Sequence, residues 1–290
     1  MIKVKRINKE DVAPVKFVDI VEDTRPIKGR DIFPEIYANI FFCARKKSGK
    51  SCAIYHTIKN CATSETRVIA FVSTLHRDPT WRSIQKLCDD MKVDFTGYTS
   101  IKDPETKEDI LDTIVKHLEQ TTDEDKEEEE KDRTRPGIIL CADDLMPHTK
   151  SGKPKRPKER APKIIFIFDD LSGELQSPSV TVLLKKNRHF MCKVLMASQY
   201  WNDIALQARK QIDYVLLYRG LAQSLDKLTD IYKNCDLSVK FDMFLDIYRF
   251  CTKEKYHFMY IDVVNSEFRR DFSHKLELPK EHEDEDERVL

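Results

Sequence analysis

Residues 36–51 read IYANIFFCARKKSGKS, and this stretch joins an apolar segment, a basic turn and the start of a helix. The segment 36–43 is apolar and rich in strand-forming side chains, which predicts a buried strand. A turn with lysines and a glycine follows it. Residues 51–62 then place Ala53, Ile54 and Ile58 on one face of a predicted helix. A strand that leads through a tight turn into a helix is typical of an α/β fold.

The rest of the chain alternates strand-like and helix-like stretches. Apolar runs predict four further strands, at 67–74, 163–170, 193–199 and 212–218. Periodicity and helix-start signals predict helices at 78–91, 107–120, 222–235 and 240–252. An edge strand is expected at 256–263. Because fully apolar strands between helices are covered on both faces, the expected fold is α/β, a three-layer sandwich with a mostly parallel central sheet.

Charged segments interrupt this pattern and set the expected domain boundaries. Residues 119–133 carry nine acidic and three basic side chains, and residues 150–163 carry seven basic side chains, one acidic side chain and three prolines. Such segments bury too little apolar surface to become ordered. We therefore expect 119–163 to be a charged, partly disordered insertion with one short strand, 137–145, inside it. The expected organisation is an N-terminal extension, one folded domain and an acidic tail, over 1–30, 31–275 and 276–290.

Composition excludes some classes of protein. The 290 residues include 50 basic and 50 acidic side chains, so any contact with nucleic acid must come from a local patch. No apolar run approaches eighteen residues, and the first residues alternate charged and apolar side chains. We therefore expect no membrane span, no signal peptide and an intracellular protein. The eight cysteines are scattered without a C-x-x-C pair, which favours reduced, buried thiols.

The turn after the first strand matches the phosphate-loop motif G-x-x-x-x-G-K-[ST], with alanine in place of the first glycine. In such a loop, backbone N–H groups at the start of a helix hold phosphate oxygens, a lysine reaches the same oxygens and a hydroxyl binds Mg²⁺. Lys50 and Ser51 are expected to fill the last two roles. Ala44 adds only a methyl group, so we expect the loop to form. The expected nucleotide-binding residues are Ala44, Arg45, Lys46, Lys47, Ser48, Gly49, Lys50, Ser51 and Cys52.

A pair of carboxylates ends the apolar strand at 163–170. A carboxylate at such a position can hold Mg²⁺, and an adjacent acid can polarise the attacking water. We expect Asp169 to bind the metal and Asp170 to activate the water. The alternative is that the pair only caps the next helix. Residues 138–145 have the same form and end in a rival pair, Asp143 and Asp144; the later pair is preferred because its strand is longer, more apolar and followed by a helix.

Three further polar side chains are candidates for a role in catalysis. Gln199 follows the strand 193–199, where a carboxamide can hydrogen-bond the attacking water or the γ-phosphate. The alternative is that this segment is a surface turn. Arg188 precedes that strand and Arg209 follows it, and either guanidinium suits the charge of a phosphoryl-transfer transition state in a neighbouring subunit. The alternative for each arginine is a solvated or ion-paired side chain.

The order of these motifs resembles that of a known family. The phosphate loop, IIFIFDDL, NRH, the strand ending in ASQY and R-x-x-x-D-Y-V-L-L-Y are similar to the genome-packaging ATPases of poxviruses and other large DNA viruses. Those proteins belong to the FtsK/HerA superfamily of RecA-like P-loop NTPases, and the resemblance covers residues 36–220. The chain departs from the pattern at Ala44, at Asp170, where many relatives have glutamate, and in the charged insertion.

The resemblance implies an ATPase that uses ATP and Mg²⁺ to drive double-stranded DNA into a preformed capsid. It implies a homo-oligomeric ring, capsid or portal-vertex proteins as partners, and a location in the virus factory and the virion. It also implies that Lys50 and Ser51 bind the nucleotide, Asp169 the metal, Asp170 the water, and that Gln199 is the polar sensor. Residues 150–163 are a candidate DNA contact; alternatively they pair with the acidic run before them.

Two other functions stay open from the residues alone. The phosphate loop is also compatible with another P-loop NTPase, such as a nucleotide kinase or a GTPase-like switch, although the N-K-x-D signature of GTPases is not found in the sequence. The departures at Ala44 and Asp170 also fit a protein that binds a nucleoside triphosphate without hydrolysing it and serves as an assembly scaffold.

Overall fold

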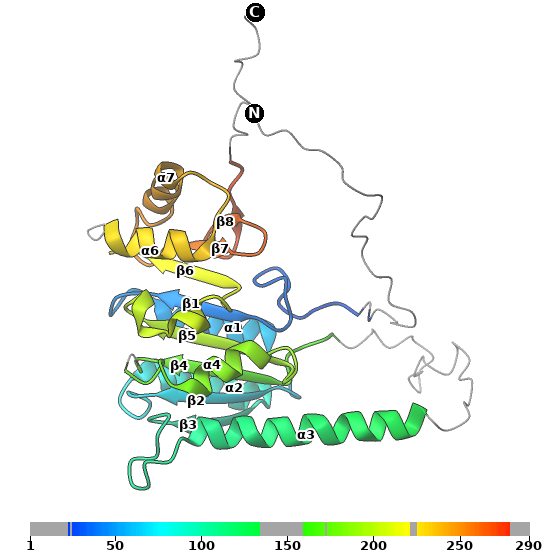
Figure 1. Ribbon diagram of the computed structural model, residues 1–290. Helices are drawn as coiled ribbons and strands as arrows, with labels where there is room; N and C mark the ends of the chain where they lie inside the picture. The colour runs from blue at the N-terminus through cyan, green and yellow to red at the C-terminus, as the bar shows by residue number, and fades with distance from the viewer. Residues whose placement is uncertain (1–22, 24, 134–158, 172, 221–224, 279–290) are drawn as a thin grey trace, which may run out of the picture.

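The computed structural model describes residues 23, 25–133, 159–171, 173–220 and 225–278 (Figure 1). Among these residues, nine strands form one sheet in the order β3-β2-β4-β5-β1-β6-β7-β8-β9. The strands are β1 Asn39–Cys43, β2 Arg67–Val72, β3 Asp94–Tyr98, β4 Ile164–Asp169, β5 Cys192–Ser198, β6 Tyr214–Tyr218, β7 Phe258–Asp262, β8 Glu267–Arg270 and β9 His274–Lys275.

The first six strands pair in parallel and the last three pair antiparallel, so the expectation of a mostly parallel sheet is confirmed. The expectation that 256–263 forms an edge strand is wrong, because β7 pairs with β8 as well as with β6. Strand β3, which forms one edge of the sheet, was not predicted from the sequence. Its residues DFTGY are exposed or half-buried and include a glycine, so they lack the apolar run that marked the central strands.

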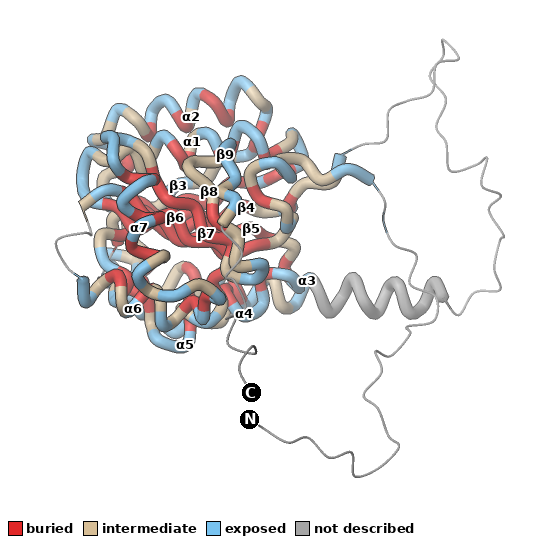
Figure 2. The backbone as a smooth tube through the Cα atoms, turned by 90° about the horizontal axis from the view of Figure 1, so that it is seen from above, coloured by how far each residue is buried: buried red, intermediate tan, exposed pale blue. Residues whose placement is uncertain are grey.

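Helices cover both faces of the sheet and make three layers. The helices are α1 Lys50–Cys61, α2 Pro79–Met91, α3 Ile110–Arg133, α4 Pro178–Lys186, α5 Leu206–Arg209, α6 Leu225–Cys235 and α7 Phe241–Cys251, with a 3₁₀ turn, η2, at Trp201–Asp203. Helices α1 and α2 lie on one face and α4 to α6 on the other (Figure 2), and α7 packs into the same core as α4 and α6. Each face has its own apolar core, and α3 contributes Leu111 and Val115 to the core beneath α4. None of the described helices is both long and apolar enough to cross a membrane.

The first part of the predicted charged insertion is helical. Residues 119–133 were expected to lie in a partly disordered segment, but they continue α3 to Arg133. The physical reason is that glutamate and lysine have high helix propensity even where they bury little surface. The C-terminal end of the insertion is also ordered. Arg160 pairs with Ile27 in an isolated parallel bridge, and the Thr66 hydroxyl donates a hydrogen bond to Pro162 O at 2.9 Å. The predicted strand 137–145, with Asp143 and Asp144, lies outside the described residues, as do 1–22 and 279–290.

The segment before the first strand packs tightly on α1 through Gly29. This glycine has φ +77°, and a Cβ atom there would lie 2.5 Å from Cys61 Sγ and 3.0 Å from Asn60 O. We expect Gly29→Ala to lower the free energy of unfolding by about 1–3 kcal/mol, because a left-handed backbone alone costs an alanine roughly 1–2 kcal/mol and the contact with Cys61 adds to it. Urea denaturation measures the change.

Gly173→Ala is the matched control, because nothing lies within 4 Å of a Cβ atom at that position. Both substitutions reduce the entropy of the unfolded chain in the same way, so their difference isolates the folded state. Equal shifts of the two denaturation midpoints would contradict the packing described for Gly29.

Candidate nucleotide-binding site

The candidate site lies at the carboxyl edge of the parallel strands. Strands β4, β5, β1 and β6 are neighbours in the sheet and run in one direction, so the loops that follow them meet at this edge. The loop 44–49 follows β1, which lies in the middle of this edge. Ala44 is buried, and its N–H donates to Ser198 O of β5 at 2.9 Å. The alanine at the first motif position therefore fits the sheet edge without distortion.

The loop then turns sharply into α1. Lys47 has φ 60° and Gly49 has φ 98°, and the Ser48 hydroxyl donates to Arg45 O at 2.7 Å. Gly49 is the N-cap residue of α1 and provides no side-chain cap, and no acidic residue stands in the first turn. The N–H groups at the start of this twelve-residue helix are therefore free of side-chain caps and carry the partial positive charge that attracts an anion.

The lysine of the loop meets the carboxylate at the end of β4. Lys50 Nζ lies 2.8 Å from Asp169 Oδ1, and the two side chains are 13% and 5% exposed. On the other side of this carboxylate, the Trp81 indole Nε1 donates to Asp169 Oδ2 at 3.3 Å. Among the described residues, Asp169 Oδ1 has no hydrogen-bond partner, so its contact with Lys50 is an ion pair.

The alternative in which Asp169 and Asp170 cap the next helix does not hold. The N-cap residue of α4 is Ser177, and the Asp169 carboxylate is engaged by Lys50 and Trp81. Asp170 is half-buried and has φ 58°, a left-handed backbone that is uncommon for a residue other than glycine. Asp169 and Asp170 both line the cavity next to the loop.

This cavity has a volume of about 400 Å³ and both signs of charge on its walls. It is lined by Lys46, Lys47, Lys50, Ser51, Thr74, Arg77, Asp78, Asp169 and Asp170. A hydroxyl and carboxylates are the oxygen ligands that Mg²⁺ prefers, and the basic side chains suit a polyphosphate. The residues present therefore fit a magnesium–nucleotide complex, with Ser51 and Asp169 as the residues that would hold the metal.

Three residues that line the cavity next to β2 and α2 were not predicted from the sequence. Thr74, Arg77 and Asp78 follow β2, whose carboxyl end reaches the same edge of the sheet. Asp78 also caps α2, because its carboxylate accepts a hydrogen bond from Thr80 N at 2.8 Å. The rule that located the carboxylates after β4, applied to the polar residues after β2, would have found Arg77 as a further cation.

Gln199 lies at this edge but outside the cavity. It follows β5, which runs between β4 and β1, and Cys43 Sγ donates to Gln199 O at 3.8 Å. The side chain is half-buried and is not among those that line the cavity. The structure therefore brings Gln199 between the loop and the carboxylates along the sheet, and its role as a sensor stays a prediction.

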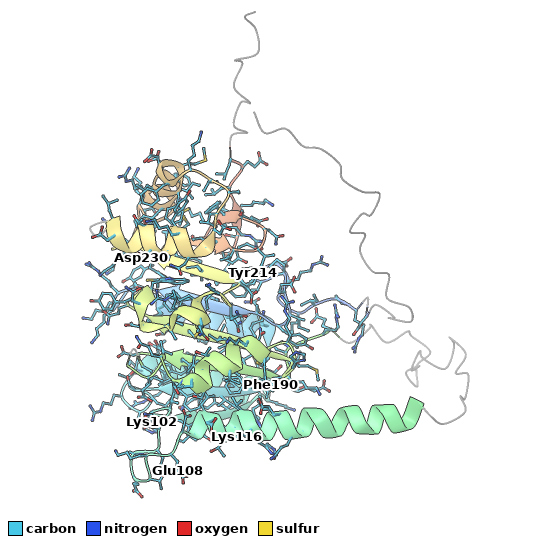
Figure 3. All side chains as sticks on the ribbon, viewed as in Figure 1. Lys102, Glu108, Lys116, Phe190, Tyr214 and Asp230 are labelled. Carbon is cyan, nitrogen blue, oxygen red and sulfur yellow. The ribbon has the colours of Figure 1, made fainter. Side chains whose placement is uncertain are left out.

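The two candidate arginines do not reach the phosphate loop of their own chain. Arg188 is exposed and precedes β5, at the amino edge of the sheet, where Phe190 and Tyr214 mark the starts of β5 and β6 (Figure 3). Arg209 ends α5, and its Nε donates to Ile204 O at 2.9 Å. Partial burial lowers the pKa of the Arg209 guanidinium. These features fit the alternative of a solvated or internally bonded side chain, and a role for either arginine toward a neighbouring subunit stays a prediction.

The remaining loop residues are solvent-facing. Arg45, Lys46 and Lys47 are exposed, and so is Cys52 in the first turn of α1. The expectation of buried thiols is wrong for Cys52, because the helical face that carries Ala53 turns inward and leaves its neighbour outside. The other described cysteines are buried: Cys43, Cys61, Cys88, Cys192, Cys235 and Cys251. Burial raises the pKa of the Cys43 thiol to about 12, so it stays protonated beside the site.

Comparison with known proteins adds a likeness in structure. No protein-family model matches the sequence, and no curated protein matches it. Solved packaging NTPases have a similar fold. The genome packaging NTPase B204 from Sulfolobus turreted icosahedral virus 2 in complex with AMP is 16% identical, with a TM-score of 0.48 over 84% of this chain and 100% of that chain.

Two other solved structures are similar to the same degree. The same NTPase in complex with AMPPCP is 15% identical, with a TM-score of 0.48 over 82% of this chain and 98% of that chain. B204, the DNA-packaging ATPase from Sulfolobus Turreted Icosahedral Virus, is 17% identical, with a TM-score of 0.47 over 81% of this chain and 96% of that chain.

Proposed function

We propose that this protein is an ATP-hydrolysing motor that moves double-stranded viral DNA into a capsid. The observation that carries the proposal is the 2.8 Å contact between Lys50 Nζ and Asp169 Oδ1. These residues lie far apart in the sequence, yet the parallel sheet brings the loop lysine to the strand-end acid beside an uncapped helix N-terminus. Triphosphate binding with magnesium requires this combination of groups.

The residues of the cavity divide the work between binding and chemistry. The N–H groups of α1 and the cations Lys46, Lys47 and Arg77 neutralise phosphate oxygens. Ser51 and Asp169 would hold magnesium, which would supply Lewis-acid stabilisation of the charge that develops on those oxygens. Asp170 accepts a proton from the attacking water. Because its side chain is one methylene shorter than that of glutamate, this proton transfer depends closely on the position of its backbone.

The DNA-related part of the proposal is supported by the order of the sequence motifs. Packaging would require a homo-oligomeric ring, in which Arg188 or Arg209 serves the site of a neighbouring subunit. Gln199 would then report on the γ-phosphate. Capsid or portal-vertex proteins would be further partners, in the virus factory and the virion. With no net charge on the chain, contacts with DNA phosphates would come from local basic groups and weaken with salt.

The test is ATP hydrolysis by the full chain, measured with and without linear double-stranded DNA. We expect turnover that DNA accelerates, and a loss of at least about a hundredfold in Lys50→Ala, because a charge-stabilising group is removed at the phosphates. Lys59→Ala is the matched control, since Lys59 is an exposed lysine in the last turn of the same helix. It should retain the wild-type rate.

Three results would contradict the proposal. Turnover that is equal in wild type and Lys50→Ala would show that the loop is not the active site. Turnover that depends on a small phosphate acceptor rather than on DNA would indicate a nucleotide kinase. Tight ATP binding without hydrolysis, with DNA and capsid proteins present, would indicate a scaffold that binds a nucleoside triphosphate.

A further inference from the structure

An aromatic residue from a distant part of the chain lies against the phosphate loop. A Cβ atom built on Gly49 would be 3.4 Å from Tyr256 Cδ1 and 3.8 Å from Tyr256 Cβ. Tyr256 precedes β7, which is antiparallel to β6 and begins where β6 ends, with Phe258 opposite Tyr218. The turn before β7 therefore reaches the same edge of the sheet as the loop after β1.

Tyr256 has an unusual backbone conformation that packing in the core does not explain. Its backbone has φ 73°, a region in which a bulky residue other than glycine is an outlier. The residue is 59% exposed, so burial does not offset this strain. Lys255 Nζ lies 4.7 Å from the ring centroid and helps to hold the ring in place. Strained backbone of this kind is concentrated at ligand sites, and here it presents an aromatic ring to solvent beside the loop.

The position of Tyr256 is also opposite to that of the metal-binding acid. In the order β4-β5-β1-β6-β7, the strand that ends in Asp169 lies two places from β1 on one side, and β7 lies two places from β1 on the other. If Asp169 holds the magnesium, the terminal phosphate would lie on its side of the loop. Phosphates that follow the loop and the start of α1 would then leave the sugar and base on the side of β6 and β7, where Tyr256 lies.

We propose that the ring of Tyr256 stacks on the base of the bound nucleotide and so gives the site its preference for a nucleotide over a bare polyphosphate. This inference rests on the proposed function, because it assumes that the loop holds the phosphates. An aromatic face is suited to any base but has most contact with a purine, the larger ring system. The contact needs the ring and not the hydroxyl group, so phenylalanine should replace tyrosine.

The test compares the binding of ATP and of inorganic tripolyphosphate, each with Mg²⁺, by isothermal titration calorimetry on the full chain. In wild type we expect ATP to bind more tightly than tripolyphosphate. Tyr256→Ala should weaken the binding of ATP by about tenfold, the usual scale of base–aromatic stacking, and change that of tripolyphosphate less than about twofold. Tyr256→Phe should bind both ligands as wild type does.

Phe250→Ala is the matched control, because Phe250 is 56% exposed and also lies near a cation, 6.0 Å from Arg270. It should bind both ligands as wild type does. Equal weakening of ATP and tripolyphosphate in Tyr256→Ala would overturn the inference and leave Tyr256 as a support for the loop. Unchanged ATP binding in that variant would overturn it too. If the wild-type protein binds neither ATP nor tripolyphosphate, the proposed function itself fails. That result differs from the two outcomes above, in which the wild-type protein binds its ligands.

Discussion

Replacing Lys50 with methionine is expected to destabilise the ligand-free protein by about 3 kcal/mol, and adding Asp169→Asn to the same chain should recover most of that loss. Asp169 is 5% exposed, and Lys50 is the described cation in contact with it. Removing one partner of a buried ion pair typically costs about 3–5 kcal/mol, because the other charge stays uncompensated. Asparagine removes that charge and can still accept the hydrogen bond from Trp81.

Urea denaturation of four proteins tests this: wild type, Lys50→Met, Asp169→Asn and the double variant. Lys59→Met controls for the loss of a lysine from α1 outside the site. A double variant that is no more stable than Lys50→Met would show that the two charges do not depend on each other. Both Lys50→Met and the double variant should fail to hydrolyse ATP, so stability and activity separate in this series.

The convergence of Lys50 and Asp169 could be predicted because it depends on strand direction alone. Buried parallel strands are recognisable as apolar runs, and their carboxyl ends must meet at one edge of the sheet. The position of each residue relative to its strand was therefore enough to predict that Lys50 and Asp169 lie close together. The same reasoning placed Gln199 between them but could not say that its side chain stays outside the cavity, since that depends on side-chain rotamers.

Other parts of the site depend on contacts that leave no periodic signal. Tyr256 reaches the loop through a turn with a left-handed residue before an antiparallel strand, and no local pattern marks that approach. The extension of α3 was missed for a different reason. Its charged residues were judged by how much surface they can bury, although helix propensity alone favours them.

Trp81 shows what the spacing of apolar residues can and cannot predict. Its spacing with Ile84, Leu87 and Cys88 on 78–91 predicts the buried face of a helix, and α2 has that face. The periodicity cannot show that the indole N–H points at Asp169 Oδ2. Trp81 is therefore both a core residue and a positioning residue for the carboxylate, and these two roles can be separated by the choice of substitution.

Trp81→Ala is expected to lower the free energy of unfolding by about 3–5 kcal/mol, because Trp81 is fully buried and the cavity cannot collapse completely. Trp81→Phe keeps an aromatic ring and loses the hydrogen bond, so it should cost about 1–2 kcal/mol. Its larger effect should be on the metal. Loss of a partner that orients a metal-binding carboxylate typically weakens metal affinity by about 10–100-fold, so the Mg²⁺ concentration for half-maximal ATP hydrolysis should rise by about tenfold.

Trp201→Phe is the matched control, because Trp201 is the second of the two tryptophans, is 3% exposed, and has no hydrogen-bond partner for its indole nitrogen among the described residues. It should lower stability through packing alone and leave the Mg²⁺ dependence unchanged. If Trp81→Phe and Trp201→Phe shift the Mg²⁺ dependence equally, the indole of Trp81 serves packing only. If only Trp81→Phe changes the Mg²⁺ dependence, the indole N–H group sets the position of the Asp169 carboxylate. By holding Oδ2, it directs Oδ1 toward Lys50.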